Sequence, residues 1–383
     1  MKSIAIKSGY IVIAVVLGYL QPQYAPPKFY IEEKVAQTAE PDETSYAPGF
    51  VNVPTPSVHA STITELPDGR FMLAWFGGSK EGAPDVIIYS CEMDWNGNFS
   101  QPKVLLDRKT LQRQTGRYIR KLGNPLLYWQ NERLHFFVVS VSVGGWSGSS
   151  INYACSDDQG ETWTPLRRLQ LSPLFNISAL VRCPPVPMTN DCIGLPIYHE
   201  FICKYGEFVV MDSHGRLFQK TKGHYDLRTL QPCSAVISPT EAVVAFRNGH
   251  KNGGAVKAAV TSDAGQTWTP IPDLPIENPD SCLALLLTDN GTLLLVGNPK
   301  EGRGTLNLWK SRMDDLQNWT LCATLENESG CEFSYPTLMK DSAGRVHLIY
   351  TWKRKSICHR VLSPELWNAQ QNKDVAQSGG KEE

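Results

Sequence analysis

The chain has 383 residues with a formal net charge of −1, and 42% of its residues are hydrophobic. A chain of this length can bury a large core, as one big all-β domain or as two domains of ordinary size. The balanced charge, with no long charge run and no basic helix expected, argues against nucleic acid and anionic membranes as partners. We therefore expect a globular protein.

The N-terminal residues 1–22 have the pattern of a signal peptide or signal anchor. Lys2 and Lys7 precede an apolar run over residues 10–20, so a short positive region is followed by a hydrophobic one. The run is shorter than the roughly 20 apolar residues that span a bilayer, and a buried helix is the alternative. We expect an exported protein that is periplasmic, secreted or anchored to a membrane through residues 8–20.

The ten cysteines show no Cys-x-x-Cys pair and no Cys/His spacing typical of a metal site. Cys183 with Cys192, and Cys322 with Cys331, are close enough in sequence to form disulfides in an exported protein. Free thiols buried within strands are the alternative. No nucleotide-binding loop and no calcium-ligand spacing is present either. The sequence predicts no cofactor and no metal.

Short strands joined by polar turns repeat along the chain. Each turn is followed by an apolar run, and the units lie about 50 to 60 residues apart, a spacing that fits blades of four short strands. The apolar runs are Phe71–Phe76, Leu134–Val139, Ile193–Tyr198, Ala242–Phe246, Thr292–Val296 and Val346–Tyr350.

Two of these units contain a matching eight-residue turn, Ser156–Trp163 and Thr261–Trp268. Both fit Ser/Thr-x-Asp-x-Gly-x-Thr-Trp. The aspartate can accept backbone N–H bonds within the turn, the glycine supplies a positive φ, and the tryptophan can pack the turn against a sheet. The pattern predicts the tip of a repeated β-hairpin and carries no chemistry of its own.

Together these repeats predict an all-β protein with a six-bladed β-propeller over residues 51–365. A linker rich in Pro, Gln and Glu precedes it at residues 23–50, and a polar tail follows at 366–383. Helical periodicity is absent except in a short stretch near Leu362–Gln371. A β-sandwich would fit the strands but not the long, even period.

The paired turns on a six-unit β chain resemble the sialidase (neuraminidase) superfamily, and in particular its bacterial BNR-repeat (Asp-box) proteins. The resemblance covers about Thr55 to Arg360. It implies a substrate on the propeller axis, three arginines that bind the carboxylate of an acidic sugar, a tyrosine nucleophile paired with a glutamate, and an aspartate as acid/base. Fixed cations suit a sugar with an obligatory carboxylate, and tyrosine nucleophiles in sialidases are an exception to the two-carboxylate rule for glycosidases.

Three positions of this chain match that pattern. Arg247 matches the second arginine, Arg303 matches the third, and Tyr335 in Phe-Ser-Tyr-Pro-Thr matches the nucleophile. Considered without the resemblance, each arginine could instead pair with a protein carboxylate, and Tyr335 could be a core aromatic residue.

Other positions depart from the pattern. His59 stands where the first arginine is expected, and Gln231 stands where the glutamate partner of the nucleophile is expected. Glu81, in the loop that ends at Asp85, takes the place of the acid/base, and Asp85 is a candidate for binding substrate. A core histidine and a solvated carboxylate are the structural alternatives for His59 and Glu81.

Three further residues could complete the site. Glu200 ends an apolar strand and could act as a general base or as a partner of Tyr335. Asn124 begins another strand and could contact substrate, and Trp146 lies in a glycine-rich loop where it could stack on a sugar.

These residues favour an exo-acting glycoside hydrolase of sialidase type that removes a terminal acidic sugar from a glycan. If Glu200 activates water, the reaction could invert configuration. A polysaccharide lyase acting on uronates is an alternative, since His59, Tyr335 and the arginines suit proton abstraction beside a carboxylate. A non-catalytic carbohydrate-binding propeller is the third hypothesis, because one arginine and the glutamate are replaced.

Overall fold

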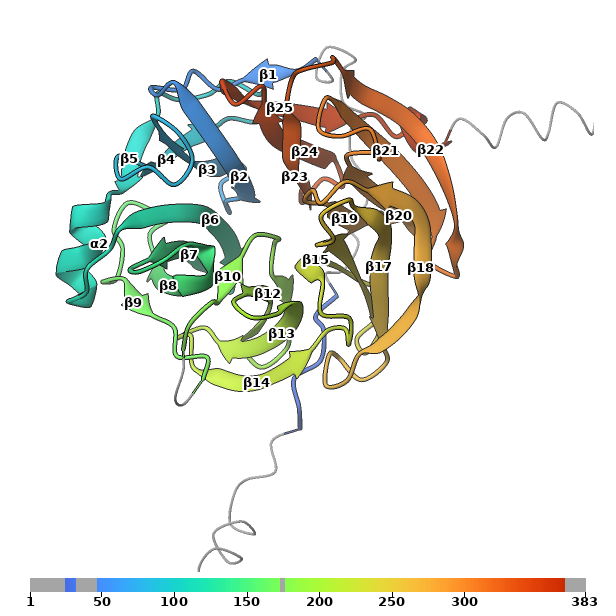
Figure 1. The fold of residues 1–383 in the computed structure, drawn as a ribbon, viewed down its shortest axis with the longest axis horizontal. Helices are drawn as coiled ribbons and strands as arrows, with labels where there is room; N and C mark the ends of the chain where they lie inside the picture. The colour runs from blue at the N-terminus through green and yellow to red at the C-terminus, as the bar shows by residue number, and fades with distance from the viewer. Residues whose placement is uncertain (1–24, 32–46, 173–175, 369–383) are drawn as a thin grey trace, which may run out of the picture.

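The computed structural model describes residues 25–31, 47–172 and 176–368. Its strands form six antiparallel sheets that are arranged as blades around a central axis (Figure 1). The predicted six-bladed β-propeller is therefore confirmed. The predicted signal segment lies outside the described residues, and within them no helix is long and apolar enough to cross a bilayer.

The first three blades follow the chain in order. Blade 1 contains β2 (Ser57–Glu65), β3 (Phe71–Gly78), β4 (Ile87–Met93) and β5 (Lys103–Leu106), and blade 2 contains β6 (Lys121–Gln130), β7 (Arg133–Val141), β8 (Ser149–Ser156) and β9 (Arg167–Arg168). Blade 3 contains β10 (Leu180–Val181), β11 (Val186–Pro187), β12 (Cys192–Glu200), β13 (Lys204–Asp212) and β14 (Leu217–Lys222).

The other three blades complete the ring. Blade 4 contains β15 (Thr229–Val236), β16 (Ala242–Asn248), β17 (Gly254–Thr261) and β18 (Thr269–Asn278), and blade 5 contains β19 (Ala284–Leu287), β20 (Thr292–Gly297), β21 (Thr305–Arg312) and β22 (Asp315–Asn327). Blade 6 contains β23 (Phe333–Lys340), β24 (Val346–Trp352), β25 (Ser356–Leu362) and the N-terminal β1 (Gly49–Phe50).

Blade 6 closes the ring because it combines the two ends of the propeller. Strand β1 pairs with β25 through Gly49 opposite His359 and Phe50 opposite Cys358. Strands β2, β6, β10, β15, β19 and β23 are the innermost of their blades and lie beside the axis (Figure 1). Consecutive strands of each blade run antiparallel. Each blade therefore contributes loops to both ends of the axis.

The core lies between neighbouring blades. Strand β3 is buried at all eight positions, which explains why its sequence is continuously apolar rather than alternating: both of its faces contact protein. The two matching turns serve this packing as predicted. Asp158 accepts the backbone N–H of Thr162 at 2.8 Å, and Asp263 accepts that of Thr267 at 2.8 Å.

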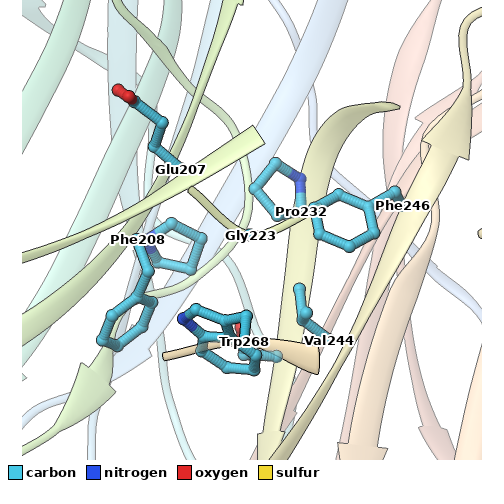
Figure 2. A pocket seen from close by; sticks show the side chains of 9 residues that line it. Glu207, Phe208, Gly223, Pro232, Val244, Phe246 and Trp268 are labelled. Carbon is cyan, nitrogen blue, oxygen red and sulfur yellow. The ribbon is translucent and has the colours of Figure 1, made fainter. Parts of the chain in front are cut away.

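The tryptophan of the second turn fills the seam between blades 3 and 4. Trp268 packs edge-on against Phe208 with ring centroids 5.4 Å apart. Figure 2 shows these two rings with Pro232, Val244 and Phe246 around a small cavity. Because the cavity is lined almost entirely by apolar side chains of the seam, it is a packing gap and not a site for a sugar.

Part of the predicted linker packs against the propeller. Phe29 is buried in the seam between blades 3 and 4, where its ring contacts that of Phe208. Its backbone N–H donates to the carbonyl of Pro239 at 2.9 Å, and that of Tyr30 donates to Pro187 at 3.0 Å. The linker prediction therefore does not describe these residues.

Two helices of the described chain lie at its periphery. Helix α3 (Glu365–Asn368) falls within the predicted C-terminal helical stretch. Helix α2 (Arg108–Thr115) was not expected, since Leu111 is its one buried residue and no apolar stripe marks it. It is stabilised at its ends instead: Asp107 accepts the N–H of Thr110, and Gly116 adopts a φ of 64°.

All ten cysteines lie in the described part of the chain, and all are free thiols. The proposed disulfides are therefore wrong, and the alternative of free thiols, most of them buried, is confirmed. Cys183 lies on the axis, where its Sγ contacts the carbonyl of Gln231 at 3.5 Å, whereas Cys192 contacts the carbonyl of Asn190 near the opposite end of blade 3.

Candidate functional site

The site is positioned by bulges in the inner strands. The pairing register shifts between His59 and Thr62 in β2, between Leu230 and Cys233 in β15, and between Ser334 and Thr337 in β23. Each bulge holds a non-glycine residue in the left-handed region: Ala60 (φ 56°), Gln231 (46°) and Tyr335 (56°). Such backbone conformations cost energy and concentrate at functional sites. Three blades thus direct side chains toward one place on the axis.

The hydroxyl of Tyr335 lies at the centre of the candidate site. Gln231 donates to it from Nε2 at 3.1 Å, and Arg247 donates from Nη1 at 3.3 Å. Arg247 also donates to Oε1 of Gln231 at 3.0 Å. Tyr335 is 9% exposed, so the ring is held by the fold and only a small part of it faces solvent. The amide of Gln231 occupies the position where the resemblance implies a carboxylate.

Two residues of neighbouring blades extend this network: Asn124, which the sequence analysis indicated as a candidate, and Tyr198, which it did not. Tyr198, on β12, accepts from Nε2 of Gln231 at 3.3 Å and from Nδ2 of Asn124 at 3.2 Å. The Asn124 amide also donates to the carbonyl of Val181 at 2.9 Å. Asn124 therefore supports the site through Tyr198, and its amide protons are used within the protein.

Two arginines lie beside Tyr335, Arg247 of blade 4 and Arg303 of blade 5, and a third from blade 6 joins them through a shared carboxylate. Arg247 pairs with Asp280 at 2.7 Å, and Arg303 pairs with Glu332 at 3.0 Å. The third is Arg354, whose Nε lies 2.9 Å from the second carboxylate oxygen of Glu332. Arginine presents five N–H donors in a planar fork, so each keeps donors beyond those used in these pairs.

Arg354 and Glu332 were missed by sequence reasoning. Arg354 lies in the turn between β24 and β25, and its backbone carbonyl accepts the N–H of Val58 beside His59. It therefore brings a cation to the part of the site where the first arginine was expected. The sequence feature that could have indicated Arg354 is the basic run Lys353–Lys355, which follows a strand of blade 6.

Glu81 reaches this cluster from blade 1. Its Oε2 accepts from Nη1 of Arg354 at 3.0 Å, and 37% of its side chain is exposed. Asp85 does not take part: both of its carboxylate oxygens accept from Ser79, which closes the loop, and these bonds lower the pKa of Asp85. The structure thus places Glu81 at the rim of the site and assigns Asp85 a local structural contact.

His59 is a hydrogen-bonded core histidine. It is 1% exposed, its Nδ1 lies 2.9 Å from the Thr351 hydroxyl, and its ring centroid lies 4.0 Å from that of Tyr335. Burial lowers the pKa of His59 well below the usual histidine value, and the nearby charge of Arg354 lowers it further. The imidazole is therefore neutral and forms the floor beneath Tyr335.

Arg182 is a further residue that the sequence analysis did not indicate. It is 1% exposed and reaches across the axis to β23, where it donates to the carbonyl of Pro336 at 3.1 Å and the hydroxyl of Thr337 at 3.1 Å. It also donates to the carbonyl of Tyr335. No described carboxylate forms an ion pair with it. Arg182 therefore holds the backbone of the Tyr335 bulge and adds a buried positive charge below the site.

Glu200 and Trp146 lie at the side of blades 2 and 3. Burial raises the pKa of Glu200, against the lowering effects of Arg247 and Lys204. The ring of Trp146 has the ammonium of Lys121 over it at 3.8 Å from its centroid, and the backbone of Gly123 approaches the ring so closely that an added Cβ would lie 2.6 Å from it. Trp146 thus packs against protein and is not a freestanding platform.

Within the described residues, no group of three His, Cys, Asp or Glu side chains is arranged to hold a metal ion. The described side chains that can take part in chemistry at this site include its arginines, its carboxyl groups and Tyr335. A carboxylate-bearing ligand is the natural complement of such an arginine cluster, because guanidinium groups bind carboxylates with paired, charge-assisted hydrogen bonds.

Comparison with solved structures identifies similar propellers at low sequence identity. The Hadza microbial sialidase Hz136 has a TM-score of 0.66 and 14% identity, over 81% of this chain and 66% of that one. The intramolecular trans-sialidase from Ruminococcus gnavus, in complex with oseltamivir carboxylate, has a TM-score of 0.67 and 12% identity, over 85% and 99%. This chain thus spans just under two thirds of the first structure and nearly all of the second.

A protein of unknown function from Dyadobacter fermentans has a TM-score of 0.66 and 12% identity, over 82% of this chain and 97% of that one. At these identities the likeness shows the fold alone. No curated protein matches the chain in sequence. The model of one family, described as the BNR repeat-like domain, matches residues 69–348, which is well over half of the chain. The chain therefore belongs to the BNR repeat-like domain family.

Proposed function

We propose that this protein is an exo-acting glycoside hydrolase that removes a terminal, carboxylate-bearing sugar from a glycan. The observation that carries the proposal is that Arg247 of blade 4 and Arg303 of blade 5 contact Tyr335. Arg354 of blade 6 adds a third guanidinium, because it shares Glu332 with Arg303. In this proposal the sugar carboxylate binds the arginines and its ring lies over the Tyr335 hydroxyl. The sialidase-like fold and the carboxylate ligand named for the Ruminococcus gnavus enzyme support the same assignment.

Glu200 is the residue best suited to donate a proton to the departing sugar oxygen. A general acid must hold its proton near neutral pH, and the burial of Glu200 raises its pKa in that direction. In this proposal Glu81, whose carboxylate is held by Arg354, is the base that activates water. Two carboxyl groups in these two roles define an inverting glycosidase.

The amide of Gln231 is the reason to assign the attack to water. A tyrosine hydroxyl is a weak nucleophile until a base removes its proton, and an amide cannot do so. Tyr335 then acts as a stabilising group: its hydroxyl, fixed by Gln231 and Arg247, faces the sugar carbon that develops positive charge.

The test is turnover of a panel of glycans capped with sialic acid or with uronic acids, followed by released sugar and near-ultraviolet absorbance together. We expect released acidic sugar, loss of at least about a hundredfold in kcat for Glu200→Gln, and restoration of part of that loss when the leaving group is an acidic phenol that needs no proton. Unchanged rates in Glu200→Gln and Glu81→Gln would overturn the proposal.

The same panel tests two other functions. A non-catalytic carbohydrate-binding propeller is favoured by one observation, the amide in place of the nucleophile's carboxylate partner, and it predicts binding without turnover in the wild type. A uronate lyase would produce an unsaturated product that absorbs in the near ultraviolet. It is disfavoured because His59, its expected base, is buried beneath Tyr335.

A further inference from the structure

A strongly basic surface covers the outer side of blade 2 and the connection that leads into it. Its eight cations come from α2, the segment that follows the helix, the start of β6, and β9. We call it the blade 2 basic surface; it consists of Arg108, Lys109, Arg113, Arg117, Arg120, Lys121, Arg167 and Arg168. The expectation that the chain has no basic helix is therefore wrong for α2.

In the part of the chain that the structure describes, these cations lack carboxylate partners at ion-pair distance. Within the described residues, none of the eight forms an ion pair with a carboxylate, whereas the arginines on the other side of the axis, such as Arg247 and Arg303, are paired. The one acidic residue within residues 107–121 is Asp107, whose carboxylate caps α2. An unpaired cluster of this kind attracts and concentrates polyanions.

Two buried donors point to a ligand at this surface. Nη1 of Arg117 and Nε of Arg168 are both shielded from solvent and have no hydrogen-bond partner. Burial lowers the pKa of Arg168, and the charge of Arg117 lowers it further, so the two guanidinium groups repel each other. Buried donors without partners are uncommon in folded proteins, so this pair of arginines carries positive charge and donors that the described residues do not satisfy.

The surface is continuous with the candidate site through Lys121. This residue begins β6, an inner strand, and its ammonium lies over Trp146. An added Cβ on Gly82, next to Glu81, would meet that ammonium at 3.5 Å. Figure 1 shows α2 at the outer edge of the ring beside β9, with β6 leading from there toward the axis. A chain of negative charges could therefore extend from the site to α2.

We propose that the blade 2 basic surface binds an acidic polysaccharide whose terminal sugar occupies the arginine cluster. This inference rests on the proposed function for the placement of the terminal sugar. In this arrangement the terminal carboxylate binds Arg247, Arg303 and Arg354, the next acidic sugar binds Lys121, and later residues lie along Arg117, Arg120 and α2. The substrate class is then a polymer of acidic sugars rather than a neutral glycan with one acidic cap.

The surface fits a hydrophilic chain better than a membrane. The solvent side of α2 carries Arg, Lys, Gln and Thr, and its one leucine, Leu111, is fully buried. A helix that inserts into a bilayer interface needs an exposed apolar face. Nucleic acid is also negatively charged, but it has no carboxylate to bind the arginine cluster that adjoins this surface. It therefore serves as a competitor in the test.

The test compares binding of three probes to the full chain: α2,8-linked hexasialic acid, oligogalacturonate of six residues, and sialyllactose with its single charge. The first variant, Lys109→Gln/Arg113→Gln/Arg120→Gln, removes three exposed charges from the blade 2 basic surface. The matched control, Lys251→Gln/Lys300→Gln/Lys355→Gln, removes three exposed lysines from loops of blades 4 to 6.

We expect the first variant to bind one of the hexamers about tenfold more weakly than wild type, with a smaller dependence of affinity on salt, and to bind sialyllactose unchanged. The control should bind all probes like wild type. Equal losses in the two variants, no loss in either, or equal displacement of the hexamer by a single-stranded DNA of the same charge would overturn the proposal.

The proposed polysaccharide-binding surface and the proposed hydrolase activity can fail independently of each other. If hexamer binding depends on the basic surface but no glycan is hydrolysed, the proposed hydrolase activity fails and the polysaccharide-binding surface stands. If sialyllactose is hydrolysed and the two triple variants behave alike on every probe, the hydrolase stands and this inference fails.

Discussion

Gln231 donates a hydrogen bond from Nε2 to the hydroxyl of Tyr335 at 3.1 Å, and 104 positions separate the two residues in the chain. Both lie at bulges of inner strands, and both have a positive φ. Backbone strain at two bulges thus holds the Gln231 amide against the Tyr335 hydroxyl. Because a glutamate of the same shape could remove the phenol proton and the amide cannot, this one contact decides what role Tyr335 can have.

Gln231→Glu is expected to change the reaction. The new carboxylate would lie beside Arg247 and could accept the Tyr335 proton, which makes the tyrosine a nucleophile. Since a positioned base typically contributes about 10²- to 10⁴-fold, we expect a faster reaction and a first-formed sugar of retained configuration, measured by NMR of the fresh product. Gln231→Met, which has no acid-base group, is the control. An unchanged rate with inverted product would show that Tyr335 does not face the reacting carbon.

Arg303→Gln is expected to weaken binding of an acidic monosaccharide and to leave a neutral one unaffected. The guanidinium lies 5.7 Å from the ring centre of Tyr335 and has donors beyond its bond to Glu332. Hydrogen bonds to charged groups contribute about 1.5 to 3 kcal/mol, so affinity measured by calorimetry should fall roughly ten- to a hundredfold. Arg312→Gln, at a side chain that is 79% exposed, is the matched control. Equal losses for the acidic and neutral sugars would contradict a carboxylate clamp.

Arg182→Met is expected to destabilise the protein. The change would remove the donor of the Tyr335 and Pro336 carbonyls, both in a buried part of β23. Leaving such groups without partners costs about 1 to 3 kcal/mol each, so the free energy of unfolding should fall by about 3 kcal/mol in urea titrations. Arg312→Met should change it by less than about 0.5 kcal/mol. If Arg182→Met is as stable as wild type, the carbonyls of the bulge find other donors.

Stability is expected to fall in mild acid because of buried neutral histidines. Burial lowers the pKa of His135 from 6.5 to about 4, so the unfolded chain binds a proton more readily than the folded one. The contribution of His135 to stability is therefore complete above pH 6.5 and is lost as the pH falls toward 4. The difference of the two pKa values corresponds to about 3 kcal/mol.

Urea titrations between pH 4 and 8 measure this effect, with His135→Gln as the test variant. Glutamine has no ionisation in this range and can keep a hydrogen bond to the Tyr153 hydroxyl, which lies 2.9 Å from Nδ1 of His135. The variant should show a flatter dependence of stability on pH than wild type. The same slope in both proteins would assign the acid sensitivity to other groups.

The sequence by itself determined the architecture. The six strand-turn units, the two matching turns and the continuous apolar runs are local patterns, and a turn such as Thr261–Trp268 closes with its own residues. The resemblance also indicated Arg247, Arg303 and Tyr335, because each lies in a recognisable strand or motif. The same resemblance set Gln231 at the position of the nucleophile's partner, and the structure shows its hydrogen bond to Tyr335.

Tertiary structure decided which charges meet. Arg354 contacts Glu81 across 273 positions of sequence, and Arg182 holds Thr337 across 155; ring closure and the order of the blades create both contacts. Helix α2 shows no apolar period, since its capping and its single buried leucine stabilise it where it packs. An ion pair between distant residues depends on which side chains the fold brings together, and a short polar helix depends on its caps and on the surface it packs against. Neither feature produces a periodic pattern in the sequence.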